Sequence, residues 1–188
     1  MCDDSLSNQI RQYAERMSED APSALAGLFD LTAQRLVRFS ITITRNQHDA
    51  EDAVQAALMS AVARPAMLTN AQEPWHYLLR MVRNESLIVL RKKRRWTLGL
   101  GIGDLLAYRA ADGLEQEDMH REVLKALRSI PLEQRQVVVL KIWEELTFQE
   151  IAEVLECSLQ TAASRFRYAI QKLAPKLVSL RGESVRDG

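Results

Sequence analysis

The stretch TFQEIAEVLECSLQTAASRFRYAIQKL, residues 147–173, constrains the fold more than any other part of the chain. Thr147 followed three residues later by Glu150 is a capping-box pattern, in which two side chains satisfy free amides at a helix start. Apolar residues recur at helical spacing over 148–155, and Ser158 can cap a second, longer helix after a polar turn. The stretch therefore predicts a helix-turn-helix.

The longer helix of this pair is expected to have one apolar and one polar face. Its predicted buried stripe has spacings of three and four residues: Leu159, Ala162, Phe166, Ile170, Leu173 and Leu177. The opposite face carries amides, hydroxyls and guanidinium groups, and no acidic residue occurs from 158 to 176. Arginine can contact guanine edges or phosphates, and glutamine can pair with adenine in two hydrogen bonds. The face predicts DNA binding, with contact to a protein as the alternative.

The composition favours helices throughout. Of 188 residues, 47% are hydrophobic, only 6% are aromatic, and glycine and proline are few. We expect an all-α protein. Around the helix-turn-helix, helices are predicted from 119 to 129 and from 132 to 143, separated near Pro131.

The net charge of zero conceals a strong segregation of charge. Residues 75–95 contain seven basic residues and one acidic residue, whereas residues 1–30 contain six acidic and two basic ones. Residues 112–122 are again acidic, with five acids and one base. Two separate basic segments in an acidic chain indicate two places that meet a polyanion. The simpler alternative is that the run RKKRR, residues 91–95, is only a solvated helix face.

The chain divides most plausibly near its middle. Four of the seven glycines fall between residues 97 and 118, a composition typical of a flexible linker. The expected organisation is an N-terminal tail over 1–21, a helical domain over 22–96, a linker over 97–118, a second helical domain over 119–180 and a C-terminal tail over 181–188. The motif GLGIG within the linker lacks the preceding strand and following GK[ST] of a phosphate-binding loop.

Several classes of protein are disfavoured by what the sequence contains. Cys2 and Cys157 are too few for a disulfide framework, and Cys157 is expected to be a small buried residue in a turn. No spacing of cysteine, histidine or acidic residues predicts a metal site or a cofactor. No apolar run approaches the ~20 residues of a membrane span, and the N-terminus has no signal-peptide pattern. A cytoplasmic protein without membrane insertion is expected.

Residues 129–173, SIPLEQRQVVVLKIWEELTFQEIAEVLECSLQTAASRFRYAIQKL, closely resemble region 4 of bacterial extracytoplasmic-function (ECF) sigma factors. The resemblance implies that the last helix binds the minus-35 promoter element and that the domain meets the flap of the polymerase beta subunit. The matching positions are Pro131, Arg135, Val137, Leu140, Glu144, Leu146, Glu150, Ile151, Ala152, Leu155, Ser158, Thr161, Ser164, Arg165 and Leu173. The implied minus-35 contacts are Gln160, Thr161, Ser164, Arg165, Arg167, Tyr168 and Lys172.

The N-terminal half extends this resemblance. LFDLTAQRLVRFS, residues 28–40, is similar to the first helix of the family, and DAEDAVQAALMSAV, residues 49–62, is similar to region 2.2. In the family this region is the main dock for the clamp helices of the polymerase beta-prime subunit. Asp49 is a good N-cap, and a buried stripe is expected at Ala53, Val54, Ala57, Leu58 and Ala61. The implied polymerase contacts are Asp49, Glu51, Asp52, Gln55 and Met59, with mere helix capping as the alternative for the acids.

Residues 74–95, PWHYLLRMVRNESLIVLRKKRR, resemble regions 2.3 and 2.4, which open the duplex and capture an unstacked base of the minus-10 element. Asn84 aligns with the asparagine of the family's base pocket and is the best candidate for base capture. Trp75 and Tyr77 can be core residues or can stack on bases. The implied minus-10 contacts, including a positive track for phosphates, are Arg80, Arg83, Asn84, Arg91, Lys92, Lys93, Arg94 and Arg95.

Several positions depart from the family pattern. The acidic residue often found four positions after Asn84 is Ile88, and the usual tryptophan ending region 2.2 is Val62. Glycines common before the capping box, in the turn and at the start of the last helix are replaced by Glu145, Glu156 and Gln160, and a frequent basic residue is Ala163. None of these changes places a charge on an apolar stripe.

The sequence thus predicts a two-domain, all-α ECF sigma factor with no catalytic residues. It would bind core RNA polymerase, recognise minus-35 and minus-10 elements of promoter DNA and help to open the duplex. An anti-sigma factor is the further partner that the resemblance implies. The alternatives are a helix-turn-helix regulator that binds an operator without polymerase and, more distantly, an enzyme built around GLGIG that uses a nucleotide.

Overall fold

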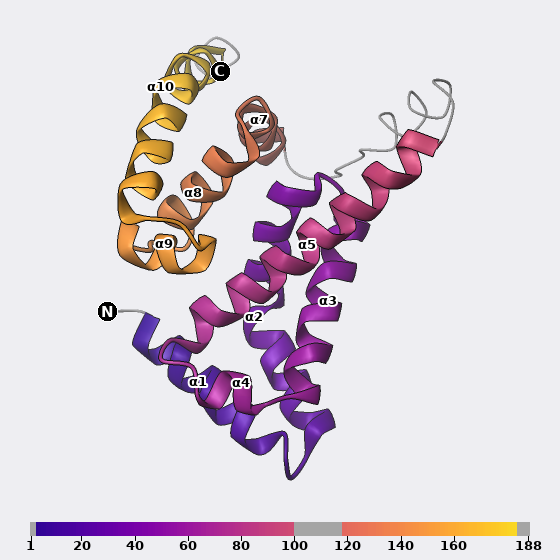
Figure 1. Ribbon diagram of the computed structural model, residues 1–188. Helices are drawn as coiled ribbons and strands as arrows, with labels where there is room; N and C mark the ends of the chain where they lie inside the picture. The colour runs from indigo at the N-terminus through magenta and orange to yellow at the C-terminus, as the bar shows by residue number, and fades with distance from the viewer. Residues whose placement is uncertain (1–2, 100–117, 184–188) are drawn as a thin grey trace. The chain divides into compact units, whose positions relative to one another are not determined.

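The computed structural model describes residues 3–99 and 118–183, and the chain divides into two compact units, 1–112 and 113–188. Every regular element in the described ranges is a helix (Figure 1). The all-α prediction is confirmed. Of the predicted linker 97–118, residues 100–117 and with them nearly all of GLGIG lie outside the described residues, as do positions 184–188 of the predicted C-terminal tail.

Three long helices form the centre of the first unit: α2 (Ala21–Thr44), α3 (Gln47–Ala63) and α5 (Pro74–Gly99). Each of the three packs against the other two, and they are the longest helices of this unit in Figure 1. Their shared core contains fully buried Leu36, Phe39 and Leu79. Between α2 and α5 the buried hydroxyls of Ser40 and Ser86 share a hydrogen bond of 2.8 Å, so these two polar groups satisfy each other in the core.

The prediction of an N-terminal tail over 1–21 was wrong. Residues Asp3–Arg16 form α1, which packs against α2, α5 and the short α4 (Ala66–Thr69). The α1 residues Leu6, Ile10 and Ala14, spaced by four, are buried together with Met17 just beyond the helix. This spacing is the helical signal that could have revealed α1 in the sequence.

Polar contacts fasten α1 to the segment before α5. The guanidinium of Arg11 donates to the backbone carbonyls of Ala71 and Gln72 at 3.0 and 3.2 Å. The hydroxyl of Ser7 donates to Glu73 at 3.0 Å. Because α1 covers apolar side chains and satisfies these groups, it is an integral part of the first unit.

The second unit contains α7 (Asp118–Arg128), α8 (Leu132–Ile142), α9 (Phe148–Leu155) and α10 (Leu159–Glu183). The long α10 packs against all three other helices of this unit. The core of the second unit includes Val137, Leu140 and Ile151, all fully buried. The four predicted helices are confirmed, although α10 continues past position 180, where the domain was expected to end, and α5 likewise continues past position 96.

Candidate functional site

The N-terminus of α3 is capped by Asn46, which corrects the expectation that Asp49 is the N-cap. The Asn46 side chain accepts a hydrogen bond from the backbone N–H of Asp49 at 3.0 Å. Asp49 therefore lies within the first helical turn, where its negative charge also suits the helix dipole. Arg45, with a left-handed backbone, ends α2, and Asn46 follows it directly as the cap of α3.

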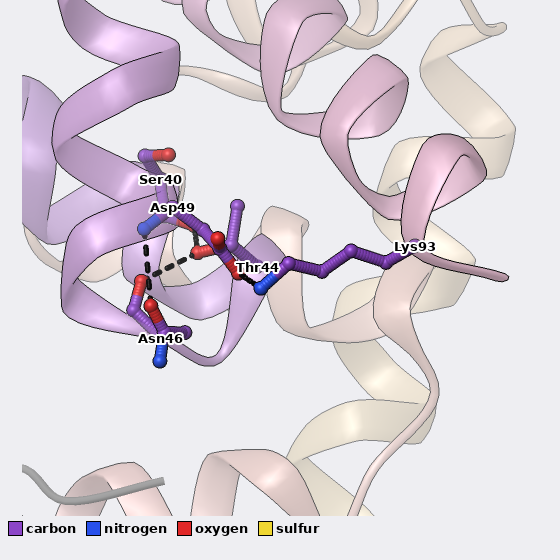
Figure 2. A network of polar contacts seen from close by, with 5 residues as sticks. All are labelled: Ser40, Thr44, Asn46, Asp49 and Lys93. Atoms are coloured by element: carbon purple, nitrogen blue, oxygen red, sulfur yellow. Dashed lines mark hydrogen bonds and ion pairs between the residues drawn. The ribbon is translucent and has the colours of Figure 1, made fainter. Parts of the chain in front are cut away.

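Asp49 and Lys93 form an ion pair between α3 and α5, as Figure 2 shows. The Asp49 side chain is only 11% exposed and that of Lys93 is 31% exposed. Nearby, the Thr44 hydroxyl donates to the carbonyls of Ser40 and Asn46, each at 3.1 Å. The structure thus joins two residues that the sequence assigned to different partners, Asp49 to polymerase and Lys93 to DNA. Both side chains help to hold α3 against α5.

The outer face of α3 presents the other predicted polymerase contacts. Glu51, Asp52 and Gln55 are exposed, and Met59 is 54% exposed. Glu51 accepts a hydrogen bond of 2.6 Å from the amide of Gln47. The predicted inner stripe is confirmed, since all five of its members are buried: Ala53, Val54, Ala57, Leu58 and Ala61. One face of α3 is therefore committed to the core and the other is available to a partner.

The two aromatic residues at the start of α5 differ in burial. Trp75 is fully buried, with the guanidinium of Arg35 4.4 Å from its ring centre, so it is a core residue and cannot stack on a base. Tyr77 is half-buried, and the guanidinium of Arg80 lies 4.8 Å from its ring centre. Arg80 and Tyr77 thus make a cation–π contact on the surface of α5.

Most of the predicted minus-10 residues share the outer face of α5. Asn84, Arg91, Lys92, Arg94 and Arg95 are exposed, while Arg80 and Arg83 are half-buried. The side-chain oxygen Oδ1 of Asn84 accepts a long hydrogen bond of 3.5 Å from the guanidinium of Arg83. Lys93 points to Asp49 instead (Figure 2). The result is a helix face with one amide followed by a cluster of positive charge.

The helix-turn-helix forms as the sequence predicts. Thr147 caps α9, and the reciprocal bonds with Glu150 complete the capping box. The Ser158 hydroxyl accepts from the Thr161 backbone N–H at 3.0 Å and so caps α10. Edge-to-face packing of Phe148 on Phe166, with ring centres 5.6 Å apart, fixes α9 against α10. Cys157 lies half-buried in the turn rather than fully buried.

The buried stripe of α10 was partly mispredicted. Ala162 and Leu173 are buried as expected, and Phe166 is half-buried, but Leu159 is 48% and Ile170 39% exposed. Ala169 is buried instead. Spacings of three and four allow either residue 169 or 170, and the position of α8 and α9 against α10 selects the smaller one. Leu177 lies in a part of α10 whose side chains are outside the described ones.

The outer face of α10 has both exposed and half-buried side chains. Gln160, Arg167, Tyr168 and Lys172 are exposed, whereas Thr161, Ser164 and Arg165 are half-buried. The Thr161 hydroxyl shares a hydrogen bond of 2.8 Å with Ser158, and the Ser164 hydroxyl donates to the Thr161 carbonyl at 3.0 Å. Donation from Ser164 to a phosphate would require this internal bond to break. The exposed amide and cations are therefore more accessible to a partner than the two hydroxyls.

Arg135 has a structural role that pattern matching did not reveal. Its side chain is 1% exposed and donates to the carbonyl of Leu127 at 2.8 Å and of Ile130 at 3.0 Å. A third contact, to the carbonyl of Arg128, measures 3.4 Å. These carbonyls lie at or just beyond the end of α7, where helix carbonyls lack intrahelical partners. Arg135 thus closes α7 from within the domain.

Glu145 and Glu156, which replace glycines of the family pattern, both have left-handed backbones with φ values of 57° and 54°. This conformation is costly for residues with a Cβ atom. Glu156 ends α9, and its N–H donates to the carbonyl of Ala152. The turn geometry that favours glycine is therefore retained without the glycine.

Neither a metal site nor a membrane span occurs among the residues that the structure describes. No group of three or more histidine, cysteine, aspartate or glutamate side chains in ranges 3–99 and 118–183 is placed to hold a metal ion. Among the same residues, no helix combines the length and the apolar character that crossing a membrane requires.

Comparison with known proteins identifies the class to which this fold and these faces belong. Residues 28–96 match the family Sigma-70 region 2, and residues 120–173 match the family Sigma-70, region 4. The first match contains α3 and α5 up to residue 96, and the second contains the helix-turn-helix. The chain therefore belongs to the sigma-70 family of RNA polymerase sigma factors.

Individual relatives place it in the ECF group. The chain is 23% identical over 186 residues to the ECF RNA polymerase sigma factor SigW of Bacillus subtilis (strain 168), covering 91% of this chain and 98% of that protein. It is 27% identical over 173 residues to the RNA polymerase sigma factor CarQ of Myxococcus xanthus, covering 92% and 99%. The protein is an ECF sigma factor, which directs transcription initiation at particular promoters.

Solved structures show the same fold. The sigma factor RpoE from Bartonella quintana, in complex with the anti-sigma factor NepR, matches with a TM-score of 0.67 and 23% identity, covering 79% of this chain and 93% of that one. CnrH, in complex with the cytosolic domain of CnrY, matches with a TM-score of 0.61 and 19% identity, covering 91% and 98%. The operator-binding alternative is not favoured, because both sigma regions occur together in this chain.

Proposed function

We propose that the outer face of α3 is the dock for core RNA polymerase, on the clamp helices of the beta-prime subunit. The observation that carries this assignment is the 54% exposure of Met59 on a helix whose opposite face is buried. A flexible thioether beside the polar, exposed Asp52 and Gln55 provides both an adaptable apolar anchor and a polar rim. Glu51 completes this face. Asp49 contributes indirectly, because its ion pair holds α3 against α5.

The outer face of α5 then receives the minus-10 element. Asn84 offers an amide donor and acceptor for the edge of an unstacked base, and the positive side chains that follow it line a track for phosphates. Trp75 supports this face indirectly, because it packs in the core on the opposite, inner side of α5. Lys93 acts mainly on Asp49, so the phosphate contacts are assigned to the exposed cations Arg91, Lys92, Arg94 and Arg95, with half-buried Arg80 and Arg83 beside Asn84.

The outer face of α10 reads the minus-35 element from the major groove. Gln160 at the helix start is placed for a base edge, while exposed Arg167 and Lys172 suit phosphates. Tyr168 and half-buried Arg165 extend the face. Thr161 and Ser164 organise the first turn of the helix through their internal hydrogen bonds. The second domain would also meet the beta flap of polymerase.

The two domains together perform promoter recognition without chemistry of their own. Binding at two DNA elements raises the overall affinity only when both elements are correctly spaced. The protein acts in the cytoplasm, where polymerase and promoter are found, and is held inactive by an anti-sigma factor. Support for that last partner comes from the likeness to RpoE, whose structure was solved with NepR.

The first test is binding to purified core polymerase by the intact chain and by the double variant Asp52→Ala, Gln55→Ala. We expect tight binding by the intact chain and at least tenfold weaker binding by the variant, which corresponds to about 1.4 kcal/mol for the two side chains together. The matched control is Gln12→Ala, Glu15→Ala, which removes one amide and one acid from exposed positions of α1.

Three outcomes separate the assignments. Weakening by the α3 variant alone supports the dock on α3. Equal, unweakened binding by both variants would place the dock elsewhere on the protein. Failure of the intact chain to bind core polymerase, together with salt-sensitive duplex binding by the protein alone, would favour the operator-binding regulator instead.

A further inference from the structure

Ile88 is an exposed aliphatic residue in the middle of the outer face of α5. It is 37% exposed and lies four residues after Asn84 and four before Lys92. Residues four apart on a helix are surface neighbours, with Cβ atoms about 5–6 Å apart. Ile88 therefore lies between the amide assigned to base capture and the cations assigned to phosphates.

The apolar core of the domain does not account for this side chain. The inner face of α5 is filled by Leu78, Leu79 and Val82, all fully buried, and by Ser86, which bonds to Ser40. Single exposed apolar residues are common on protein surfaces and need no special cause. Ile88 differs by its position, because its exposed neighbours at spacings of three and four are an amide and cations.

The chemistry of DNA limits what an aliphatic group on such a face can recognise. The faces of the bases and the C–H groups of the sugars offer apolar contacts that are the same along the strand. Among the base edges, which carry the sequence information, the apolar substituent is the 5-methyl group of thymine. Asn84 and the cations of α5 gain nothing from a methyl group, but a branched aliphatic side chain gains by removing it from water. An acidic residue at this position, which the family often has, would lack this contact and would repel phosphates.

We propose that Ile88 is a specificity-determining residue that contacts the 5-methyl group of a thymine in the minus-10 element, beside the base held by Asn84. This inference rests on the proposed binding of minus-10 DNA by α5. It adds a preference at one promoter position that the polar residues of the helix do not supply. The loss of one methyl contact corresponds to about fourfold weaker selection.

The test uses the full chain assembled with core polymerase. The holoenzyme selects DNA from a duplex library with a randomised minus-10 segment, prepared once with thymine and once with deoxyuridine, which lacks the methyl group. The same selections are made with Ile88→Ala. The matched control is Phe29→Ala, which shortens another exposed large apolar residue, 50% exposed on α2 of the same domain.

We expect the intact holoenzyme and the Phe29→Ala control to prefer thymine at one minus-10 position. Replacing thymine by deoxyuridine should weaken that preference about fourfold, and Ile88→Ala should remove the sensitivity to the methyl group. Unchanged base preferences in Ile88→Ala, or equal selection of thymine and deoxyuridine by the intact holoenzyme, would overturn the inference alone. If the holoenzyme selects no minus-10 sequence, the proposed function of α5 fails, and the role of Ile88 fails with it.

Discussion

Replacing Arg135 by leucine should selectively loosen the second domain. The substitution keeps an aliphatic group in the buried site but removes the donors that bond to the carbonyls of Leu127 and Ile130 at 2.8 and 3.0 Å. Hydrogen bonds from a charged donor contribute about 1.5–3 kcal/mol each, so the loss of two costs about 3–6 kcal/mol. The third contact, at 3.4 Å, is too long to add much.

Hydrogen exchange followed by mass spectrometry measures this loss in the full chain, because it reports on each domain separately. Each 1.4 kcal/mol changes an equilibrium about tenfold, so amides of α8 should exchange at least 100 times faster in Arg135→Leu. Arg135→Lys, which can keep one bond, should show an intermediate effect. Peptides from α2 and α3 provide an internal reference in the other unit.

The control is Arg167→Leu, since Arg167 is exposed in the same domain. A surface change of this kind should alter stability by no more than about 0.5 kcal/mol. If α8 of Arg135→Leu exchanged within about threefold of the intact chain, the buried guanidinium would not be holding the end of α7. The same conclusion would follow if Arg167→Leu accelerated exchange as much as Arg135→Leu.

Three other substitutions test separate contacts. Asp49→Asn and Lys93→Met should each destabilise the first domain to urea, and a double-mutant cycle should give a coupling of about 1 kcal/mol; strict additivity would mean that the ion pair contributes nothing. Glu156→Gly should stabilise the second domain by about 0.5–1 kcal/mol in thermal unfolding, because the left-handed backbone strain that it removes is larger than the entropic cost of ordering a glycine. A lower melting temperature would contradict this. Lys172→Ala in the holoenzyme should weaken binding to all promoter sequences about equally, and the slope of log K against log salt concentration should decrease by about one in magnitude. A change in sequence preference would instead assign Lys172 to a base.

The helix-turn-helix is the part of the site that could be predicted best. Its signals are local: Thr147 and Glu150 are three residues apart, and Ser158 directly precedes the helix that it caps. The inner stripe of α3 was equally accessible, because helical spacing alone identifies a buried face. In both places the residues that decide the structure lie within a few positions of one another.

Predictions failed where a contact joins distant parts of the chain. The ion pair of Asp49 with Lys93 spans 44 positions, and its partners belonged to separate motifs in the sequence. The docking of α1 through Arg11 spans 60 positions, so the apolar spacing within α1 could indicate a helix but not the distant segment against which it packs. The choice between Ala169 and Ile170 as a buried residue likewise depended on α8 and α9.

The sequence by itself determined that this protein is helical, that it has a capped helix-turn-helix, and that basic residues gather on one face of each of two helices. Those properties follow from helical periodicity and short-range capping, which act along the chain. The tertiary structure decided which side chains are held in contacts between helices and which remain exposed. It committed Asp49, Lys93 and Arg135 to holding helices together and left Met59, Asn84 and Ile88 exposed, because burial depends on which helices pack together.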